Sequence, residues 1–462
     1  MRKVPALSSV PFPTLRQFLI GLAFLVCFAY LGYFPAQNDF IGIAVGYIPA
    51  FVLYGLILRR RTPALRWWLG VAVVVRLILL PAPPLLSDDT YRFLWDGHLL
   101  AAGLNPFEQL PGYYLTEPVP GLTPELYDRL NSPEYFTIYP PVAQLAFLLS
   151  VWIGTTVAGS TLVLKLIVIG FELGTLFLLP KLLRRYGFPA ERALLYALNP
   201  LLILEISGNL HFEGVMVFFL AAALWYLAGQ KPVRAAVFLS LSIASKLLPL
   251  MFAPLLLRRL PWGKLWPAGI ALVVVCGLLF APLVSGVFLE NFGSSLDLYF
   301  RKFEFNASVY YLARWVGYLR VGWNQIATIG PALALCSLAA MLFYTLLEKR
   351  PTLKNLPAGM LFFVSVYLVL ATTVHPWYLA LPVFLCAFTQ FRYPIVWSAL
   401  IWLTYINYSY DPYRENLWIV GLEYTILFGF ILYELMRYYQ RKREDVPAVA
   451  EPNGIEAGRQ ST

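Results

Sequence analysis

The sequence predicts an all-α polytopic membrane protein with about 13–14 transmembrane helices and two long outer loops that carry juxtamembrane helices. Hydrophobic residues make up 59% of the 462 residues and charged residues only 13%, whereas soluble domains are about one quarter charged. The apolar residues are grouped in runs close to the length of about 20 residues that a helix needs to cross a bilayer. These observations exclude a soluble enzyme, a disordered chain and a disulfide-stabilised scaffold.

Fourteen apolar segments are predicted to be spans. The pair at 233–258 is either one kinked span or a re-entrant pair. Residues 441–462 are polar and are predicted to form a disordered cytoplasmic tail, so that residues 1–440 form a single membrane domain. The predicted spans cover residues 17–34, 40–59, 66–83, 161–180, 187–204, 214–229, 233–246, 247–258, 266–284, 326–347, 356–373, 377–390, 393–408 and 418–437.

The charges predict the orientation of these spans. With the N-terminus in the cytoplasm, 25 basic and 6 acidic residues fall on the cytoplasmic side, a net charge of +19, and 7 basic and 16 acidic residues fall outside, a net charge of −9. Because an excess of Lys and Arg marks cytoplasmic loops, both termini are predicted to be cytoplasmic and the protein to lie in the cytoplasmic (inner) membrane. The overall charge of +10 therefore reflects orientation and does not indicate a nucleic-acid partner.

Two outer loops are long, at about 84–160 and 285–325. Within the first loop, residues 141–157 are apolar enough to cross the membrane. If they crossed, Arg184 and Arg185 would lie outside, against the charge rule. We therefore expect this segment to lie along the outer interface as an amphipathic helix.

The first polar cluster follows the third predicted span, where Asp88 and Asp89 are adjacent. Neighbouring carboxylates repel, so the pKa of one rises unless a cation compensates, and a carboxylate beside the membrane is well placed to take a proton from a hydroxyl. The acids are also good helix caps, and the pair alone does not separate the two roles. Tyr91, Arg92, Trp95 and Asp96 follow at helical spacing.

A second cluster contains Glu205, His211 and Glu213 between two predicted spans. The chain has only three histidines, and His98, His211 and His375 all map to the outer face. A His-x-Glu pair supplies two metal ligands, which is a weak metal site, and contact with a phosphate or a sugar hydroxyl is the alternative.

The other polar features lie in three further outer segments. Lys246 lies between apolar stretches, where it must snorkel or find an anion such as phosphate. His375 and Trp377 follow the 356–373 span, and Asn306 lies in the second outer loop. No polar neighbours are evident for Arg76 or Lys165, which fall within predicted spans. Acids, cations and aromatic residues together on one side suit a lipid-linked phosphosugar, because aromatic faces stack on sugars and cations bind phosphate.

The chain resembles the GT-C superfamily of polytopic glycosyltransferases, and is most similar to bacterial polyprenyl-phosphate-mannose-dependent mannosyltransferases. The resemblance covers roughly residues 66–390. The motifs that carry it are Ser87-Asp88-Asp89 with Tyr91 to Gly97, Gly103-x-Asn105-Pro106-Phe107, Tyr139-Pro140-Pro141-Val142-Ala143-Gln144, Asn199-Pro200-Leu201 with Glu205, His211-Phe212-Glu213, Lys246-Leu247-Leu248-Pro249 and His375-Pro376-Trp377-Tyr378.

The resemblance implies an inverting transfer of a hexose from a polyprenyl-monophosphate sugar to the hydroxyl of a glycan or glycolipid outside the cytoplasm. Mannose is favoured, and glucose, galactose, arabinose and aminoarabinose are the alternatives. Asp88 is the first choice of general base and Asp89 the second. The residues expected to bind the donor phosphate or sugar are Arg92, Lys246, His211, Glu213, His375 and Tyr139, with Trp95, Asp96, Glu205, Asn306 and Trp377 in support.

Two questions accompany this interpretation. No cofactor is required by the sequence, but a divalent cation such as Mg²⁺ or Mn²⁺ is a candidate, with Asp88, His211 and Glu213 as its ligands.

The alternative function is a transporter or flippase for a lipid-linked sugar, which would place ionisable residues at mid-membrane. Only Glu172, Glu423 and Glu434 are acidic residues within predicted spans, and they form no evident cluster, which favours the enzyme. No Walker loop indicates nucleotide binding.

Overall fold

The structure of the chain is a computed structural model that describes residues 13–59 and 64–444. These residues are helical or lie in connecting loops, and the one pairing of extended backbone among them joins Phe305 to Thr373. The predicted all-α class is confirmed. Most of the predicted tail, from residue 445 onward, lies outside the described residues, and the last helix continues to Glu444.

The helices follow the chain in three groups. The first is α1 (Leu15–Tyr33), α2 (Phe40–Leu58), α3 (Leu65–Leu79), α4 (Asp89–Ala101), η1 (Pro111–Leu115), α5 (Pro124–Tyr127) and α6 (Pro141–Ile153). The second is α7 (Val157–Arg185), η2 (Ala190–Ala193), α8 (Leu194–Ala197), α9 (Pro200–Leu202), η3 (Ile203–Gly208), α10 (Glu213–Ala228), α11 (Pro232–Ser245), η4 (Leu248–Phe252) and α12 (Ala253–Leu257). The third is α13 (Trp262–Phe280), η5 (Ala281–Leu283), α14 (Phe288–Arg301), α15 (Val309–Val321), α16 (Ile326–Leu347), η6 (Leu353–Asn355), α17 (Leu356–Leu370), η7 (Pro376–Leu379), α18 (Ala380–Cys386), α19 (Tyr393–Leu400), η8 (Ile401–Ser409) and α20 (Leu417–Glu444).

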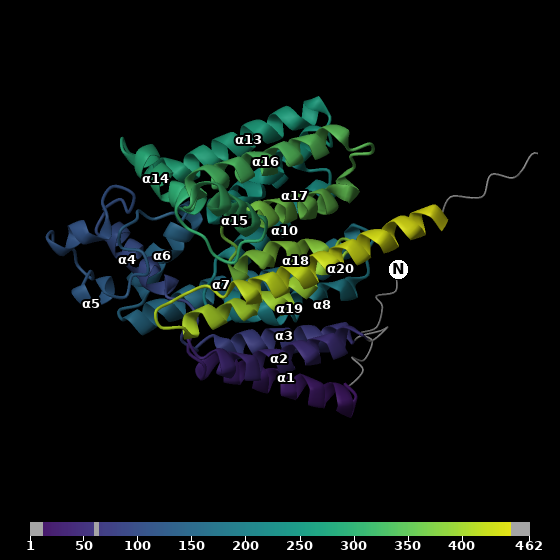
Figure 1. Ribbon diagram of the computed structural model, residues 1–462, viewed down its shortest axis with the longest axis horizontal. Helices are drawn as coiled ribbons and strands as arrows, with labels where there is room; N and C mark the ends of the chain where they lie inside the picture. Colours follow the sequence, from purple (N-terminus) through teal and green to yellow (C-terminus); the bar gives the residue numbers. More distant parts are fainter. Residues whose placement is uncertain (1–12, 60–63, 445–462) are drawn as a thin grey trace, which may run out of the picture.

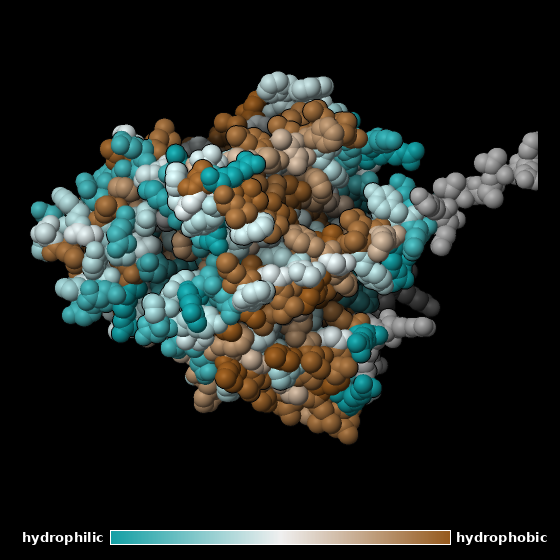
Figure 2. Space-filling view, viewed as in Figure 1, coloured by the Kyte–Doolittle hydropathy of each residue, from teal (hydrophilic) through white to brown (hydrophobic). Residues whose placement is uncertain are grey.

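Seven helical segments of the described chain are long and apolar enough to cross a membrane, or eight if one bent pair counts as a span. The seven are Leu15–Tyr33, Phe40–Leu58, Val157–Arg185, Trp262–Leu283, Ile326–Leu347, Leu353–Leu370 and Leu417–Lys442. The long helices run side by side, with α4, α5 and α6 at the end of the bundle opposite the first residues of α1 and the last residues of α20 (Figure 1). We call these the loop end and the terminal end. Hydrophobic residues form a broad belt over the helices, and hydrophilic residues gather at both ends (Figure 2).

The number of complete spans is smaller than the 13–14 predicted, because several apolar runs are broken into short pieces. Residues 187–204 form η2, α8 and α9, residues 377–390 form η7 and α18, and residues 393–408 form α19 and η8. Proline occupies the first turn of α9, η7 and α19, where its missing N–H costs no hydrogen bond. The apolar composition of these segments predicted complete spans. In the structure, proline residues divide them into short helices.

Two uncertain segments are now defined. Helix α6 has 13 residues and is about 20 Å long, which is too short for the roughly 30 Å of a bilayer core, and it lies at the loop end. Its position along the outer interface stays a prediction. Residues 233–258 form two short pieces, α11 and the η4–α12 segment, separated by extended backbone at Lys246.

The two long loops pack against each other. Asn105 Nδ2 donates a hydrogen bond to the Leu283 carbonyl over 2.8 Å, and Asn291 Nδ2 donates one to the Phe107 carbonyl over 2.8 Å. The Phe107 ring also contacts Phe288 in α14, with 5.0 Å between ring centroids. These contacts join the segment after α4 to α14.

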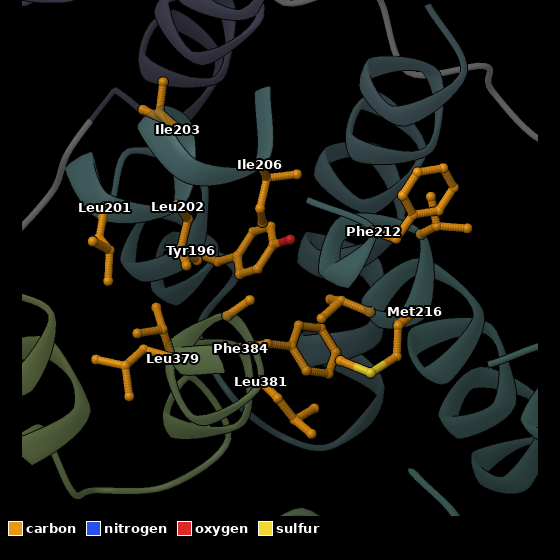
Figure 3. Packing of buried hydrophobic residues seen from close by; sticks show 14 of the residues in the cluster. Tyr196, Leu201, Leu202, Ile203, Ile206, Phe212, Met216, Leu379, Leu381 and Phe384 are labelled. Carbon is orange, nitrogen blue, oxygen red and sulfur yellow. The ribbon is translucent and has the colours of Figure 1, made fainter. Parts of the chain in front are cut away.

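One helix pair is sharply bent. The segments Pro200–Gly208 and Glu213–Ala228 meet at 112°, and the first of them ends in a six-residue π-helix, η3. A π-helix inside a membrane segment commonly marks a functional site. The bent segment is held by apolar packing, in which Phe384 of α18 faces Tyr196 and Met216 (Figure 3), with 6.0 Å between the Tyr196 and Phe384 rings.

A buried ion pair lies against this bend. Arg76 Nη2 donates to Glu172 Oε2 over 2.9 Å, and both side chains are fully buried. The Tyr196 hydroxyl donates to Glu172 Oε1 over 2.5 Å, and a Cβ added to Gly214 in α10 would lie 3.0 Å from the same oxygen. The expectation that Arg76 has no polar neighbours is wrong, because Glu172 of α7 faces Arg76 of α3. The two residues are 96 positions apart in the sequence, so the contact could not be seen there.

The buried pair gives a prediction about stability. Arg76→Met or Glu172→Leu alone leaves a buried charge without its partner, which typically costs about 3–5 kcal/mol. We expect each single variant to lower the unfolding temperature in detergent strongly, and the Arg76→Met/Glu172→Leu double variant to be more stable than either single variant. Losses that simply add in the double variant would show that the two side chains are not coupled.

Candidate active site

The acidic pair lies where α4 begins. Asp88 is the N-cap residue of α4 and Asp89 is its first helical residue. The Asp88 side chain makes no capping hydrogen bond and is exposed, so helix capping does not account for its carboxylate. The alternative role of the pair as simple caps is therefore not supported.

Asp89 is held from several directions. Asn131 Nδ2 donates a hydrogen bond to Asp89 Oδ1 over 2.8 Å, and the Tyr139 hydroxyl also donates to this carboxylate. On the other side, His211 Nε2 lies 3.8 Å from Asp89 Oδ2. Asp89 is thus fixed by the first long loop and faces the bend between η3 and α10.

The surroundings raise the pKa of both aspartates. Partial loss of hydration raises the pKa of Asp88 above its ordinary value. Burial is also the main cause that raises the pKa of Asp89, and it outweighs the opposing effects of the Asn131 hydrogen bond and the Lys246 ammonium. A carboxylate with a raised pKa is a stronger base than an ordinary aspartate.

His211 lies in the bend, between the two halves of the broken helix. Its ring is 2% exposed. Nδ1 lies 2.8 Å from the Glu205 carbonyl oxygen and 3.4 Å from Glu205 Oε2. Glu205 is buried in η3 and accepts a hydrogen bond from the Tyr405 hydroxyl over 2.7 Å. The bend therefore places His211 between Glu205 and Asp89 as their common neighbour.

A stack of rings covers His211. Trp377 lies over His211 with 3.8 Å between ring centroids, and His375 lies over Trp377 with 4.5 Å between centroids. Phe305 from the second long loop completes the stack against His375, at 4.8 Å. The backbone of Phe305 exchanges hydrogen bonds with Thr372 and Val374, which fixes the loop against the segment that carries His375.

Lys246 faces the same region from the end of α11. Its ammonium donates to Glu213 in the first turn of α10 and lies 4.8 Å from the centre of the Tyr378 ring. The Lys246 side chain is 32% exposed, whereas that of Glu213 is 2% exposed. Because an ammonium can donate three hydrogen bonds, Lys246 retains accessible capacity for an anion.

The structure does not bring three of the predicted residues into this cluster. The Arg92 guanidinium pairs with Asp96 over 3.0 Å and donates to the Tyr135 carbonyl over 2.9 Å. Asp96 also accepts a hydrogen bond from Gln144, and Trp95 is fully buried against Tyr127. These contacts join α4 to α6 and to the loop between them, and they engage the Arg92 guanidinium.

Asn306 supports the ring stack from outside. Its side-chain amide donates to Glu423 over 3.2 Å, and its carbonyl accepts a hydrogen bond from the Tyr424 hydroxyl over 2.7 Å. Glu415 accepts a hydrogen bond from the backbone N–H of Asn306. These contacts anchor the segment that carries Phe305 to α20, and they place Asn306 behind the site.

The donor set for a metal ion is limited. Among residues 13–59 and 64–444, no three His, Cys, Asp or Glu side chains are grouped as a metal ion requires. Asp88, His211 and Glu213, the predicted ligands, do not form such a group. The use of a divalent cation stays a prediction.

Several members of the cluster were missed in the sequence. Asn131, Tyr405 and Phe305 touch Asp89, Glu205 and His375 respectively. Each comes from a loop or a 3₁₀ segment distant from its partner in sequence, and nothing in its local pattern distinguishes it. Only the three-dimensional arrangement identifies them.

The ring stack gives a prediction about solvent access. Trp377→Ala removes the ring that covers His211, so we expect several-fold faster modification of His211 by diethyl pyrocarbonate, measured for each of the three histidines by mass spectrometry. Trp315 is 63% exposed on α15, and Trp315→Ala is the matched control that leaves the His211 rate unchanged. An unchanged rate in Trp377→Ala would contradict the observed stacking.

The chain is similar to known mannosyltransferases. Residues 36–260 match the family model described as alpha-(1->6)-mannopyranosyltransferase, N-terminal domain, a region that includes the acidic pair, the bend and Lys246. Over 172 residues the chain is 28% identical to alpha-(1->6)-mannopyranosyltransferase A of Mycobacterium tuberculosis, in an alignment that covers 36% of this chain and only 32% of that relative. The expected resemblance to polytopic mannosyltransferases of the GT-C type is confirmed by both similarities.

Proposed function

We propose that this chain is a membrane mannosyltransferase whose active site is the cluster around Asp88, His211 and Lys246. In this proposal the donor is mannose on a polyprenyl monophosphate, and the acceptor is the hydroxyl of a glycan or glycolipid outside the cytoplasm. The observation that carries the proposal is that the accessible Asp88 carboxylate, next to Asp89, lies at one end of an apolar bundle together with the Lys246 ammonium and the stack of rings over His211. Similarity to mannosyltransferases over residues 36–260 supports the choice of sugar.

The transfer needs one base and one stabilised leaving group. Asp88 takes the proton of the acceptor hydroxyl, and the acceptor oxygen attacks the anomeric carbon. The bond between this carbon and the phosphate oxygen breaks, and the polyprenyl phosphate leaves with the bonding electrons. Attack opposite the leaving group inverts the anomeric configuration. General base catalysis of this kind contributes about 10²–10⁴-fold.

Asp88 is a better base than Asp89 because its carboxylate is available. The Asp88 carboxylate is exposed and accepts no hydrogen bond from the described residues, whereas Asp89 accepts hydrogen bonds from Asn131 and Tyr139. A base needs a free lone pair directed at its substrate. Asp89 is then a residue that organises the site next to the base.

Lys246 is the residue we assign to the leaving phosphate. Its partner Glu213 neutralises it in the absence of substrate and holds the ammonium in place. A phosphate that bound beside Lys246 would gain an ionic hydrogen bond in a weakly hydrated place, where such bonds are strongest. Stabilisation of developing charge is usually the largest contribution to enzymatic catalysis.

Transport of a lipid-linked sugar fits the structure less well. A transporter requires ionisable residues that line a path across the membrane. The fully buried Arg76 and Glu172 side chains are bonded to each other, and the pair also bonds Ala72, Ala197 and Tyr196. This pair is a structural contact closed to solvent, whereas Asp88 and Lys246 are accessible.

The base assignment predicts the effect of one substitution. Asp88→Asn retains the size of the side chain but cannot accept the proton, so we expect mannosyl transfer by the purified protein to fall about 10²–10⁴-fold with an unchanged unfolding temperature. Because the pKa of Asp88 is raised and the base must be ionised, kcat/KM of the unmodified protein should fall as the pH decreases through that raised pKa.

A matched control comes from the same loop. Asp128 is exposed in the segment after α5, and Asp128→Asn should retain normal transfer. Near-normal transfer by Asp88→Asn would overturn the base assignment, and equal losses in both variants would point to a general effect of charge on the loop.

The phosphate assignment predicts a different change. Lys246→Ala should raise the donor concentration needed for half-maximal rate, because the donor loses its ionic contact, and it should leave the half-saturating concentration of the acceptor unchanged. Lys302 is exposed in the second long loop, and Lys302→Ala is the control. An unaltered donor titration in Lys246→Ala would reject the assignment.

A further inference from the structure

A groove runs along the outside of the bundle between α2 and the segment formed by α19 and η8. One wall is the face of α2 that carries Ile48, Val52, Gly55 and Arg59, and the other wall belongs to residues at the junction of α19 and η8. The groove has a volume of about 530 Å³, which lies within the range of small-molecule sites. None of the candidate active-site residues lines it, so the proposed transfer does not account for this groove.

The walls of the groove are apolar and open. Ile48 and Val52 are 51% and 58% exposed, and a Cβ added to Gly55 would meet no atom within 4 Å. The Tyr47 hydroxyl at the other end of the α2 wall is already engaged, because it donates a hydrogen bond to the Ser398 carbonyl over 2.6 Å. An apolar chain therefore fits this part of the groove.

One end of the groove carries a positive charge. Arg59 is the C-cap residue of α2 and is exposed, and no described residue accepts a hydrogen bond from its guanidinium or forms an ion pair with it. Because α1 begins at the terminal end and α2 returns to that end (Figure 1), Arg59 lies at the terminal end of the bundle. In the sequence it is followed by Arg60 and Arg61. A guanidinium without a partner favours an anion such as phosphate at this end.

The length of the groove matches one layer of lipid. The lining residues of α2 extend from Tyr47 to Arg59, a distance of about 18 Å along a helix that rises 1.5 Å per residue. One layer of lipid contributes about 15 Å to the roughly 30 Å of a bilayer core. An acyl chain whose headgroup lies beside Arg59 therefore reaches Tyr47.

We propose that this groove holds one acyl chain of an anionic phospholipid, whose headgroup phosphate pairs with Arg59. Basic residues beside a membrane helix attract acidic headgroups, whereas a zwitterionic headgroup already balances its phosphate with its own cation. The hollow between α1 and α2 provides a contrast, because it is lined by apolar residues alone and has no group that selects a headgroup. The proposal does not depend on the transferase activity.

The test titrates the full-length protein in detergent with dioleoyl-phosphatidylglycerol and with dioleoyl-phosphatidylcholine, and measures bound lipid by native mass spectrometry. The two lipids have the same acyl chains and differ in the charge of the headgroup. We expect one site that binds phosphatidylglycerol about fivefold more tightly, which is the effect typical of one basic residue near acidic headgroups. The unfolding temperature should also be higher in phosphatidylglycerol, because a lipid that binds the folded protein stabilises it.

Two variants with matched controls test the two parts of the site. Arg59→Gln should remove the preference for phosphatidylglycerol, whereas Arg441→Gln, at an exposed position of α20, should retain it. Gly55→Phe places a ring in the groove and should weaken the binding of both lipids several-fold. Gly277→Phe is its control, because Gly277 is an exposed glycine of α13 whose added Cβ also meets no atom within 4 Å. Phenylalanine favours a helix more than glycine does, so both variants should fold.

Three results would overturn the proposal. The first is equal affinity of the unmodified protein for the two lipids, or a preference that survives in Arg59→Gln. The second is displacement of bound phosphatidylglycerol by an equimolar amount of polyprenyl phosphate, because the groove would then belong to the lipid of the sugar donor. The third is an equal rise of the unfolding temperature with inorganic phosphate alone, which would show an anion site that binds no acyl chain.

Discussion

The bend between Gly208 and Glu213 is the feature on which the rest of the site depends. A helix that breaks at membrane depth exposes backbone and polar side chains that must be satisfied by the protein itself. Here the 112° change of direction places Glu205 before the break, His211 within it and Glu213 after it. Each of these residues finds its partner in a different part of the chain, at Tyr405, Trp377 and Lys246. The break thereby gathers segments that are separated by up to 200 residues.

Two ion pairs join elements of the bundle, Arg76 with Glu172 and Lys246 with Glu213, because an unpaired buried charge is costly. The buried Lys165 and Glu423 side chains instead form hydrogen bonds with uncharged groups. Asp88 differs, since it is exposed and engaged by no described residue. A carboxylate without a hydrogen-bond partner is available to act as a general base. The ion pairs fix the positions of the helices, and the unpaired Asp88 carboxylate is available to take a proton.

Much of the architecture was predictable from the sequence, because long apolar runs and the charge asymmetry both follow from the cost of placing polar groups in a bilayer. The acidic pair, His211, Glu213 and Lys246 were also identified, and the structure brings them together. Helix breaks were harder to predict, because proline in an apolar run is compatible with either a kinked span or two short pieces. Arg92 was expected from the resemblance to bind the donor phosphate or sugar, whereas in the structure its guanidinium pairs with Asp96. Asn131, Phe305 and Tyr405 carry no local signal, since their roles arise only from contacts across the fold.

The central claim is that the chain transfers mannose from a polyprenyl monophosphate. The most direct measurement is a transfer assay in which purified protein meets a panel of donors: polyprenyl-phosphate mannose, the corresponding glucose, galactose, arabinose and aminoarabinose lipids, and a nucleotide-linked mannose, each with and without a chelator. We expect transfer from the mannosyl lipid with inverted anomeric configuration, and none from the nucleotide sugar. Transfer from the nucleotide sugar alone, or from none of the lipid donors, would contradict the account.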